Sequence, residues 1–268
     1  ISGVSGSLST AFGAHTGIGT LPILLYGNEE QRMHYLPGLS TGELMGAYCL
    51  TEPGAGSDAN SGKTKAELSA DQKTYKINGQ KIWISNAGFA DVFTVFARIE
   101  NDQYLTAFIV DKGNAGMTFG DEENKLGIRA SSTRQVFFND CEVPTSSLLG
   151  ERNGGFKIAM NSLNYGRIKL AVACMEAARR VITYSVSYAN ERKQFGVAIS
   201  SFGALQYKMA EMLTRTWVAE GAIYRAGQDI ENHIIRLQEQ GLEPKIAKLK
   251  GVEEYAIECA ILKVLGSE

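Results

Sequence analysis

The sequence predicts an α+β protein, in which a central antiparallel β domain lies between two helical domains. Two changes in the hydrophobic period along the chain predict this class. Residues 1–45 carry helix-like segments, residues 46–152 alternate apolar and polar side chains, and residues 153–268 repeat apolar residues at three- and four-residue steps. No internal repeat or low-complexity tract interrupts these three zones, which we therefore interpret as three domains.

In the first zone, the clearest expected helix covers residues 29–36. Asn28 is a suitable N-cap residue, because its side-chain oxygen can accept a hydrogen bond from a free N–H group of the first turn. Glu29 and Glu30 follow it, and acidic side chains are favourable at the positive end of a helix dipole. We expect this zone to be helical up to the first strand at Gly46.

The second zone contains an apparent β-hairpin. The letters TYKI precede Asn78 and Gly79, and QKIWIS follows them. An Asn-Gly pair between two alternating runs is typical of a type I′ turn, whose twist matches that of paired strands. We therefore expect a two-residue hairpin turn at Asn78 and Gly79.

Alternation along the return strand would place Trp83 and Ser85 on one face. Ile82 and Ile84 would then lie on the opposite face, since successive side chains of a strand point to opposite sides. An aromatic ring and a hydroxyl on one face could contact a common ligand. The alternative is a tryptophan packed on a neighbouring helix beside a solvated serine.

Residues 47–58 read AYCLTEPGAGSD, a β-type run that Pro53 ends and a glycine-rich loop follows. Gly54 and Gly56 have no Cβ atom, so the N–H groups of this loop could approach a flat or anionic ligand closely. The alternative is a tight turn that needs glycine at positive φ.

The third zone predicts a helical bundle. We expect three apolar stripes: Phe156, Ala159, Leu163, Leu170, Cys174, Ala177, Val181 and Tyr184; Leu205, Met209, Met212, Ala219, Ile223, Ala226 and Ile230; and Ile246, Leu249, Ala256, Ala260 and Val264. Arg167 falls within the first stripe. Because an unpaired buried charge costs several kcal/mol, Arg167 should meet either an internal carboxylate or an anionic or carbonyl-rich ligand.

Composition and charge restrict the classes of partner. The chain has 268 residues, 44% of them hydrophobic, and a net charge of −2. Its 27 basic and 29 acidic residues are interspersed, so no basic stripe is available for nucleic acid. The four cysteines lack metal-ligand spacing, so we expect a reducing compartment and no metal site. We see no secretory signal and no apolar run long enough for a membrane span, so membrane association is not indicated.

Four segments together carry a family resemblance: AYCLTEPGAGSD at 47–58, WISN at 83–86, NYGR at 164–167 and ERKQFG at 191–196. In this order they resemble the signatures of the acyl-CoA dehydrogenase flavoproteins, and the resemblance covers nearly the whole chain. GAHTGIG near the start and VLGSE at the end are most similar to very-long-chain and longer bacterial members. The resemblance implies that both helical domains are incomplete here, with helices expected before Ile1 and after Glu268.

The resemblance implies FAD as the cofactor and acyl-CoA as the substrate. The residues it places on FAD are Tyr48, Cys49, Leu50, Thr51, Gly56, Ser57, Trp83, Ile84 and Ser85. It places Ser57, Asn164 and Arg167 near the acyl-CoA ligand. Arg192, Gln194 and Phe195 match residues that reach the FAD of an adjacent subunit, which implies at least a dimer.

The implied reaction is α,β-dehydrogenation of fatty acyl-CoA, of long chain by overall similarity, to trans-2-enoyl-CoA in β-oxidation. Electrons would pass to an electron-transfer flavoprotein, in the cytoplasm of a bacterium or the mitochondrial matrix of a eukaryote. An acyl-CoA oxidase and a non-catalytic assembly or scaffold protein are the alternatives.

We assign no catalytic residue from the sequence. The resemblance implies a glutamate as general base, which we expect beyond Glu268. Some family members place this glutamate immediately before the arginine that Arg167 matches, but Gly166 occupies that position here. We therefore expect residues 1–268 alone to be inactive.

Overall fold

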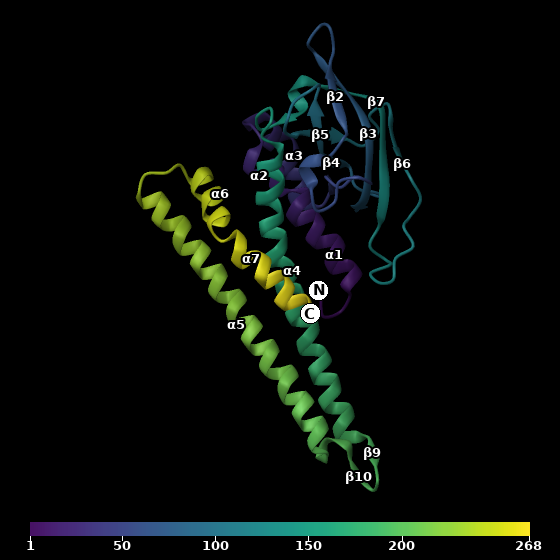
Figure 1. The fold of residues 1–268 in the computed structure, drawn as a ribbon, viewed down its shortest axis with the longest axis vertical. Helices are drawn as coiled ribbons and strands as arrows, with labels where there is room; N and C mark the ends of the chain where they lie inside the picture. The colour runs from purple at the N-terminus through teal and green to yellow at the C-terminus, as the bar shows by residue number, and fades with distance from the viewer. The chain divides into compact units, whose positions relative to one another are not determined.

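The computed structural model describes residues 1–268 and confirms the α+β class, with helices before and after a sheet in chain order (Figure 1). The chain divides into two compact units. One is Thr10–Gly166, and the other combines Ile1–Ser9 with Arg167–Glu268. The three-domain division of 1–45, 46–152 and 153–268 stays a prediction.

Four helical elements precede the first strand of the sheet. They are α1 (Gly6–Ala14), the π-helical turn η1 (His15–Gly19), α2 (Leu21–Tyr26) and α3 (Glu29–Thr41). The predicted cap is confirmed, because the Asn28 side chain accepts the Gln31 N–H at 2.8 Å and the Gln31 side chain accepts the Asn28 N–H at 3.1 Å. The helix runs five residues beyond the expected end, to Thr41, where Gly42 adopts φ +82°.

The stretch Gly6–Tyr26 corrects one expectation, since it is long and apolar enough to cross a membrane, with a mean hydropathy of 1.2. That criterion rests on length and composition alone. The stretch is not one regular helix, because Gly17 has non-helical φ −104° and ψ −106°. His15 within it is buried, where its Nε2 contacts the Leu39 carbonyl at 3.0 Å and its Nδ1 accepts the Gly46 N–H at 3.1 Å. These two contacts require Nδ1 unprotonated and Nε2–H as donor.

One eight-stranded sheet forms the middle of the chain. Its strands are β1 (Gly46–Cys49), β2 (Lys65–Leu68), β3 (Thr74–Ser85), β4 (Val92–Ile99), β5 (Thr106–Asp111), β6 (Met117–Phe119), β7 (Thr133–Pro144) and β8 (Leu148–Leu149). The path runs β6-β7-β3-β2-β4-β5-β8, and β1 pairs with β4. The sheet is mixed, whereas the sequence predicted an antiparallel one, because β1 and β2 both run parallel to β4. Short 3₁₀ turns lie at Ala59–Ser61 and Thr145–Ser147.

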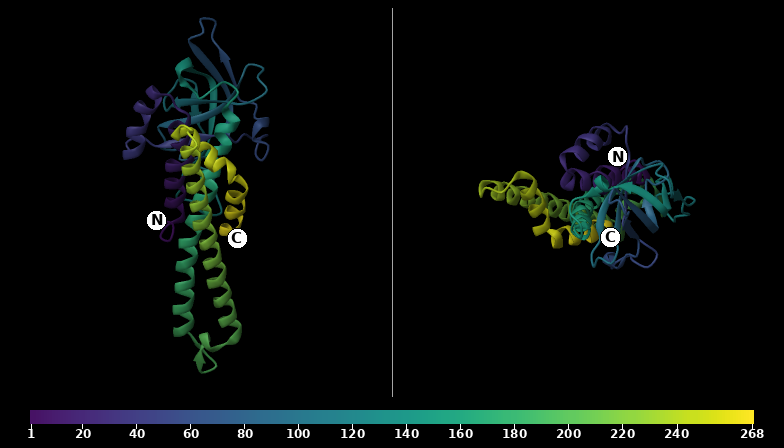
Figure 2. Two further views of the ribbon diagram at one scale, coloured as in Figure 1. Left: turned by 90° about the vertical axis from the view of Figure 1, so that its left-hand side faces the viewer. Right: turned by 90° about the horizontal axis from the view of Figure 1, so that it is seen from above.

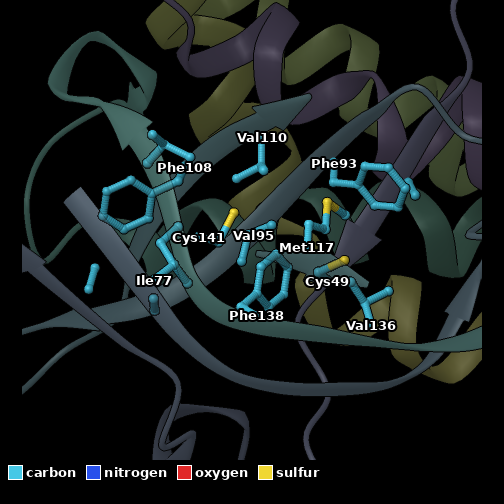
Figure 3. Packing of buried hydrophobic residues seen from close by; sticks show 14 of the residues in the cluster. Cys49, Ile77, Phe93, Val95, Phe108, Val110, Met117, Val136, Phe138 and Cys141 are labelled. Carbon is cyan, nitrogen blue, oxygen red and sulfur yellow. The ribbon is translucent and has the colours of Figure 1, made fainter. Parts of the chain in front are cut away.

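Alternate residues of the central strands fill two separate clusters. Phe93 and Val95 of β4 belong to one, and Val92 and Phe96 to the other, as the period of two requires. Figure 3 shows the first cluster, in which Cys49 and Cys141 are free thiols among aromatic and branched side chains. Burial raises the pKa of Cys49 to about 12 and that of Cys141 to about 11, so both behave as apolar filler.

Two long helices dominate the end of the chain. The elements are α4 (Gly155–Glu191), β9 (Lys193–Gln194), β10 (Val197–Ala198), the 3₁₀ turn Ile199–Ser201, α5 (Gly203–Glu239), α6 (Pro244–Glu254) and α7 (Ala256–Ser267). Beyond Arg167, α4 and α5 lie side by side and meet at the β9–β10 hairpin (Figure 2). Arg179 of α4 and Glu220 of α5 form an ion pair between them.

The three predicted apolar stripes agree with the observed burial to different extents. The α5 stripe is confirmed in its second half, where Ala219, Ile223, Ala226 and Ile230 are buried. The α4 stripe is wrong at Phe156, Leu170, Val181 and Tyr184, which are exposed, while Ile158, Ala171 and Met175 are buried instead. The third stripe spans two helices that break at Tyr255, with Leu249 buried but Ile246 and Val264 exposed. Periodicity locates apolar residues on one face of a helix, but it does not show which of them a neighbouring element covers.

The predicted hairpin at Asn78 and Gly79 is wrong. TYKINGQKIWIS forms the single strand β3, and the register with β7 shifts between Ile77 and Gly79. The Asn78 side chain accepts the Asp140 N–H at 2.8 Å and donates to the Asp140 carboxylate at 3.0 Å, so Asn-Gly occupies a β-bulge and not a turn. A two-residue turn with both φ angles positive occurs instead at Phe195 (+54°) and Gly196 (+82°), between β9 and β10.

We predict that Gly79→Ala lowers the free energy of unfolding by about 1–3 kcal/mol. Gly79 has φ +155°, and an added Cβ would lie 2.8 Å from the Thr64 Cα, so β2 and β3 would have to separate locally. Urea denaturation measures the loss. Gly127→Ala is the matched control, since a Cβ there meets nothing within 4 Å and its φ is not positive. A Gly79→Ala protein as stable as the control would contradict the close approach.

Candidate functional site

The loop after β1 begins from three buried residues. Tyr48, Cys49 and Leu50 are at most 7% exposed, and the Tyr48 hydroxyl donates to the Ala159 carbonyl at 3.2 Å. Burial raises the pKa of Tyr48 far above its usual value, so the phenol stays neutral. These side chains belong to the core, and only their backbone atoms can serve a ligand on the surface.

The glycines of this loop are not explained by the chain's own structure. Neither Gly54 nor Gly56 adopts positive φ, and a Cβ added to either would meet nothing within 4 Å. The tight-turn explanation for these glycines is therefore contradicted. One physical reason for glycine at both positions is that a molecule outside the chain approaches the loop backbone closely.

The same loop presents unused hydrogen-bond donors. Glu52 and Ala55 bond each other through their backbones, at 3.1 Å in both directions. The N–H groups of Thr51, Gly54 and Ser57 have no acceptor within residues 1–268. Several free N–H groups within one loop can together donate to an anion or to a carbonyl-rich ring.

Trp83 lies beside this loop in a strained conformation. The Ile82 N–H donates to the Thr51 carbonyl at 2.9 Å, which joins the loop to β3. The register with β7 shifts between Lys81 and Ile84, and Trp83 has φ +60°. A bulky residue in the left-handed region costs about 1–3 kcal/mol, and its indole is still 57% exposed.

This bulge corrects the alternation argument for β3. Two residues, Ile82 and Trp83, lie opposite one residue of β7, so regular alternation does not carry from Ile82 to Ile84. Ile84 is buried, and Ser85 is half-buried opposite Thr133. The structure thus brings the Thr51 loop to the strand segment that holds Trp83 and Ser85, by a different geometry from the predicted one.

A buried ion pair, which the sequence analysis missed, anchors the loop. The Lys81 ammonium is fully buried, and it donates to the Glu52 carboxylate at 2.7 Å and to the Leu50 carbonyl at 3.2 Å. The carboxylate also accepts the N–H groups of Lys63 at 2.5 Å and Thr64 at 3.1 Å. The sequence does place a lysine within an apolar strand. A charge buried in such a strand needs a partner of opposite charge, so this lysine could have predicted the ion pair.

Both members of this pair have shifted pKa values. Burial would raise the pKa of Glu52, but the Lys81 ammonium and the N–H donors hold it below its usual value. Burial lowers the pKa of Lys81, and the Glu52 charge opposes that shift. The depressed pKa of Glu52 keeps its carboxylate ionised near neutral pH, and the 2.7 Å contact of this carboxylate with the Lys81 Nζ fixes the loop to β3.

The residues of NYGR divide between the two compact units. Asn164 is buried on α4 in the first unit, near Asn161, whose amide donates to the Tyr26 hydroxyl at 2.8 Å. Arg167 is half-buried in the second unit, where its charge opposes the rise that burial causes in the pKa of the Cys259 thiol.

The residues of ERKQFG all lie exposed in the second unit. Arg192 follows α4, Gln194 ends β9, and Phe195 is 93% exposed at the hairpin turn. The Phe195 ring meets the Phe202 ring edge to face, with centroids 6.2 Å apart, and most of its surface stays exposed. It is available to a surface outside this unit.

Comparison with known proteins agrees with this organisation. Residues 1–43, 47–141 and 153–266 match the N-terminal, middle and C-terminal domains of acyl-CoA dehydrogenase. The chain is 46% identical over 264 residues to a probable acyl-CoA dehydrogenase of Bacillus subtilis, covering 98% of this chain and 44% of that protein. It is 41% identical to the human mitochondrial very long-chain specific acyl-CoA dehydrogenase, covering 96% of this chain and 38% of that protein.

A solved structure has the same fold. The crystal structure of an acyl-CoA dehydrogenase complexed with FAD from Bacillus anthracis superposes with a TM-score of 0.93 at 46% identity, over 97% of this chain and 44% of that one. The three consecutive matches and this superposition define the class of the fold, an α+β fold in which helical segments precede and follow a central sheet. The chain belongs to the acyl-CoA dehydrogenase family, and it spans less than half the length of these relatives.

We predict that Glu52→Gln lowers the free energy of unfolding by about 3–5 kcal/mol at neutral pH, because Lys81 is left buried without a counter-charge. The added variant Lys81→Met in the same chain should recover most of the loss. Since the folded-state pKa of Glu52 is depressed, its contribution is present above the unfolded-state pKa and disappears as pH falls through the folded-state value. The stability difference between wild type and Glu52→Gln should therefore narrow in acid.

Chemical denaturation at several pH values measures this difference. Glu29→Gln is the control, since Glu29 pairs with Arg32 at 2.8 Å on the surface, where such pairs contribute at most about 1 kcal/mol. Equal losses for Glu52→Gln and Glu29→Gln would show that the buried pair does not anchor the loop.

Proposed function

We propose that the protein containing this chain is an FAD-dependent enzyme that dehydrogenates a fatty acyl-CoA thioester to the trans-2-enoyl-CoA. The observation that carries the proposal is the exposed, strained Trp83 beside a loop of unused donors whose glycines nothing in the chain requires. Membership of the acyl-CoA dehydrogenase family and the FAD complex of the Bacillus anthracis relative support it.

The residues at this site fit a flavin. A tricyclic ring needs a flat apolar partner and donors for its carbonyl and nitrogen edge, which the Trp83 indole and the N–H groups of the loop can provide. The hydroxyls of Thr51 and Ser85 have no partner within residues 1–268 and suit the ring edge. Gly56 and Ser57 would lie along the cofactor, and Tyr48, Cys49, Leu50 and Ile84 would contribute through backbone atoms.

FAD, when bound, supplies the hydride acceptor. The work of the protein is to place the acyl chain and to stabilise negative charge on the thioester oxygen as the α proton leaves. We assign Ser57, Asn164 and Arg167 to the acyl-CoA side of the site. We assign no general base among residues 1–268, because Gly166 carries no side chain to accept a proton.

The hairpin residues support a shared site between two subunits. Arg192 offers a planar fork that can hold a pyrophosphate by parallel charge-assisted bonds, and Gln194 adds an amide. Phe195, 93% exposed, favours cover by a second copy of the chain. We therefore propose that the active protein is at least a dimer, with these three residues on the FAD of the adjacent subunit.

The human very long-chain specific relative favours a long acyl substrate. An electron-transfer flavoprotein is the proposed acceptor, and oxygen, as in an acyl-CoA oxidase, is the alternative. Cytoplasm in a bacterium or mitochondrial matrix in a eukaryote is the proposed compartment. A family member that serves as a scaffold would bind flavin without turnover.

Anaerobic addition of palmitoyl-CoA to the flavin-loaded intact protein should bleach the flavin absorbance. A series of shorter acyl-CoA thioesters then reports chain-length preference. Reoxidation by electron-transfer flavoprotein without peroxide supports the dehydrogenase, whereas peroxide formed in air identifies an oxidase. Bound flavin that no acyl-CoA bleaches would overturn the proposed reaction.

We predict that Gly56→Ala weakens FAD binding about tenfold or more, which corresponds to about 1.4 kcal/mol, while the stability of the flavin-free protein changes by less than about 0.5 kcal/mol. A Cβ at this position meets only open space in the chain, so its steric effect should appear only with ligand. Titration with FAD followed by flavin fluorescence measures the affinity. Gly127→Ala, in a different loop and also unhindered, is the control and should leave FAD binding unchanged.

A further inference from the structure

The strained segment that holds Trp83 needs restraint on both sides. On the N-terminal side, the Ile82 N–H is bonded to Thr51. On the C-terminal side, Asn86 also has positive φ, at +67°, and its N–H donates to the Ser132 carbonyl at 3.0 Å. The segment 83–86 therefore depends on Ser132 and on the first residues of the neighbouring strand β7.

One carboxylate, that of Glu122, accepts hydrogen bonds from Ser132 and from the first two residues of β7. Glu122 accepts the Ser132 hydroxyl at 2.7 Å and the Arg134 Nε–H at 2.7 Å on Oε1, and the Thr133 N–H at 2.9 Å on Oε2. Thr133 and Arg134 are the register partners of Ser85 and Ile84. Glu122 thus organises the start of β7, which pairs with the two residues that follow Trp83.

The loop after Asn86 is bonded to the same group. The Gly88 N–H donates to the Ser132 hydroxyl at 2.9 Å, and this hydroxyl in turn donates to Glu122. A Cβ on Gly88 would lie 2.6 Å from the Ser132 Oγ and 2.7 Å from the Glu122 Oε1, so the contact is close. Through Ser132, the carboxylate is therefore linked to both Asn86 and Gly88, on the C-terminal side of the bulged segment.

A simple surface ion pair does not describe this arrangement. Arg134 and Glu122 are 33% and 46% exposed, so their mutual attraction contributes little to overall stability. The three donors nevertheless converge on one carboxylate, and one of them is a backbone N–H. Such an arrangement fixes geometry locally more than it raises the global free energy of unfolding.

We propose that Glu122 is a positioning residue, which holds the Trp83–Asn86 segment in its strained conformation through Ser132, Thr133 and Arg134. The consequence for flavin rests on the proposed function. If Trp83 and Ser85 contact the ring, Glu122 acts on FAD affinity without touching FAD.

Amide hydrogen exchange of the intact protein, prepared free of flavin, tests the positioning role directly. In Glu122→Gln, we expect the amides of Asn86 and Gly88 to exchange at least about tenfold faster, while the amides of residues 74–78 at the far end of β3 stay unchanged. Glu142→Gln is the matched control, since Glu142 forms an exposed ion pair with Lys76 at the other end of the same strand pair, at 3.3 Å. It should leave Asn86 and Gly88 unaffected.

Unchanged exchange at Asn86 and Gly88 in Glu122→Gln overturns the inference, as does equal acceleration along all of β3, which would mean general destabilisation. If Glu122→Gln does not fold, Ser132→Ala removes the same hydrogen bond between the Ser132 hydroxyl and Glu122. Because Gly88 then loses its own acceptor, the exchange of Asn86 and of residues 83–85 is measured in that variant. In the flavin-loaded protein we expect about tenfold weaker FAD binding. Local acceleration with unaltered FAD binding would support the positioning role and contradict the assignment of Trp83 to the flavin.

Discussion

The fold around the candidate site depends on one buried ion pair. Lys81 lies inside β3 with no exposed surface, and Glu52 in the loop after β1 is its counter-charge. Because an ammonium cannot stay buried alone, the loop must come to the strand, and it brings Thr51 against Ile82. The loop is on the surface, yet its position is set by the electrostatics of the core.

This anchoring leaves the rest of the loop unusually open. Gly54, Gly56 and Ser57 make few contacts with the chain, and their donors have no internal acceptors. A loop fixed at its base and open at its tip is preorganised for a ligand, because little further ordering is needed on binding. The strained Trp83 opposite it fits the same description, since strain persists only where the surrounding structure enforces it.

Two groups of contacts hold this segment of β3 in place. Glu52 and Lys81 fix the side that meets the loop after β1, and Glu122 with Ser132 fixes the side that faces β7. The first is buried and bears on global stability, whereas the second is partly exposed and bears on local geometry. A family fold can thus keep its core and still adjust the position of an exposed aromatic residue through a surface carboxylate.

The sequence by itself determined the succession of helical and β zones, the Asn28 cap and the segments around Thr51 and Trp83, because these follow from local periodicity, capping chemistry and motif. Only the tertiary structure decided that Asn78-Gly79 forms a bulge within β3, that the sheet is mixed, and that Lys81 pairs with Glu52. The reason is physical: a bulge and a buried ion pair depend on what lies across the sheet, and neighbours 29 or 62 residues away leave no mark on local pattern. Exposure of Leu170 and Tyr184 on α4 was missed for the same reason, since periodicity shows an apolar stripe without showing what covers it.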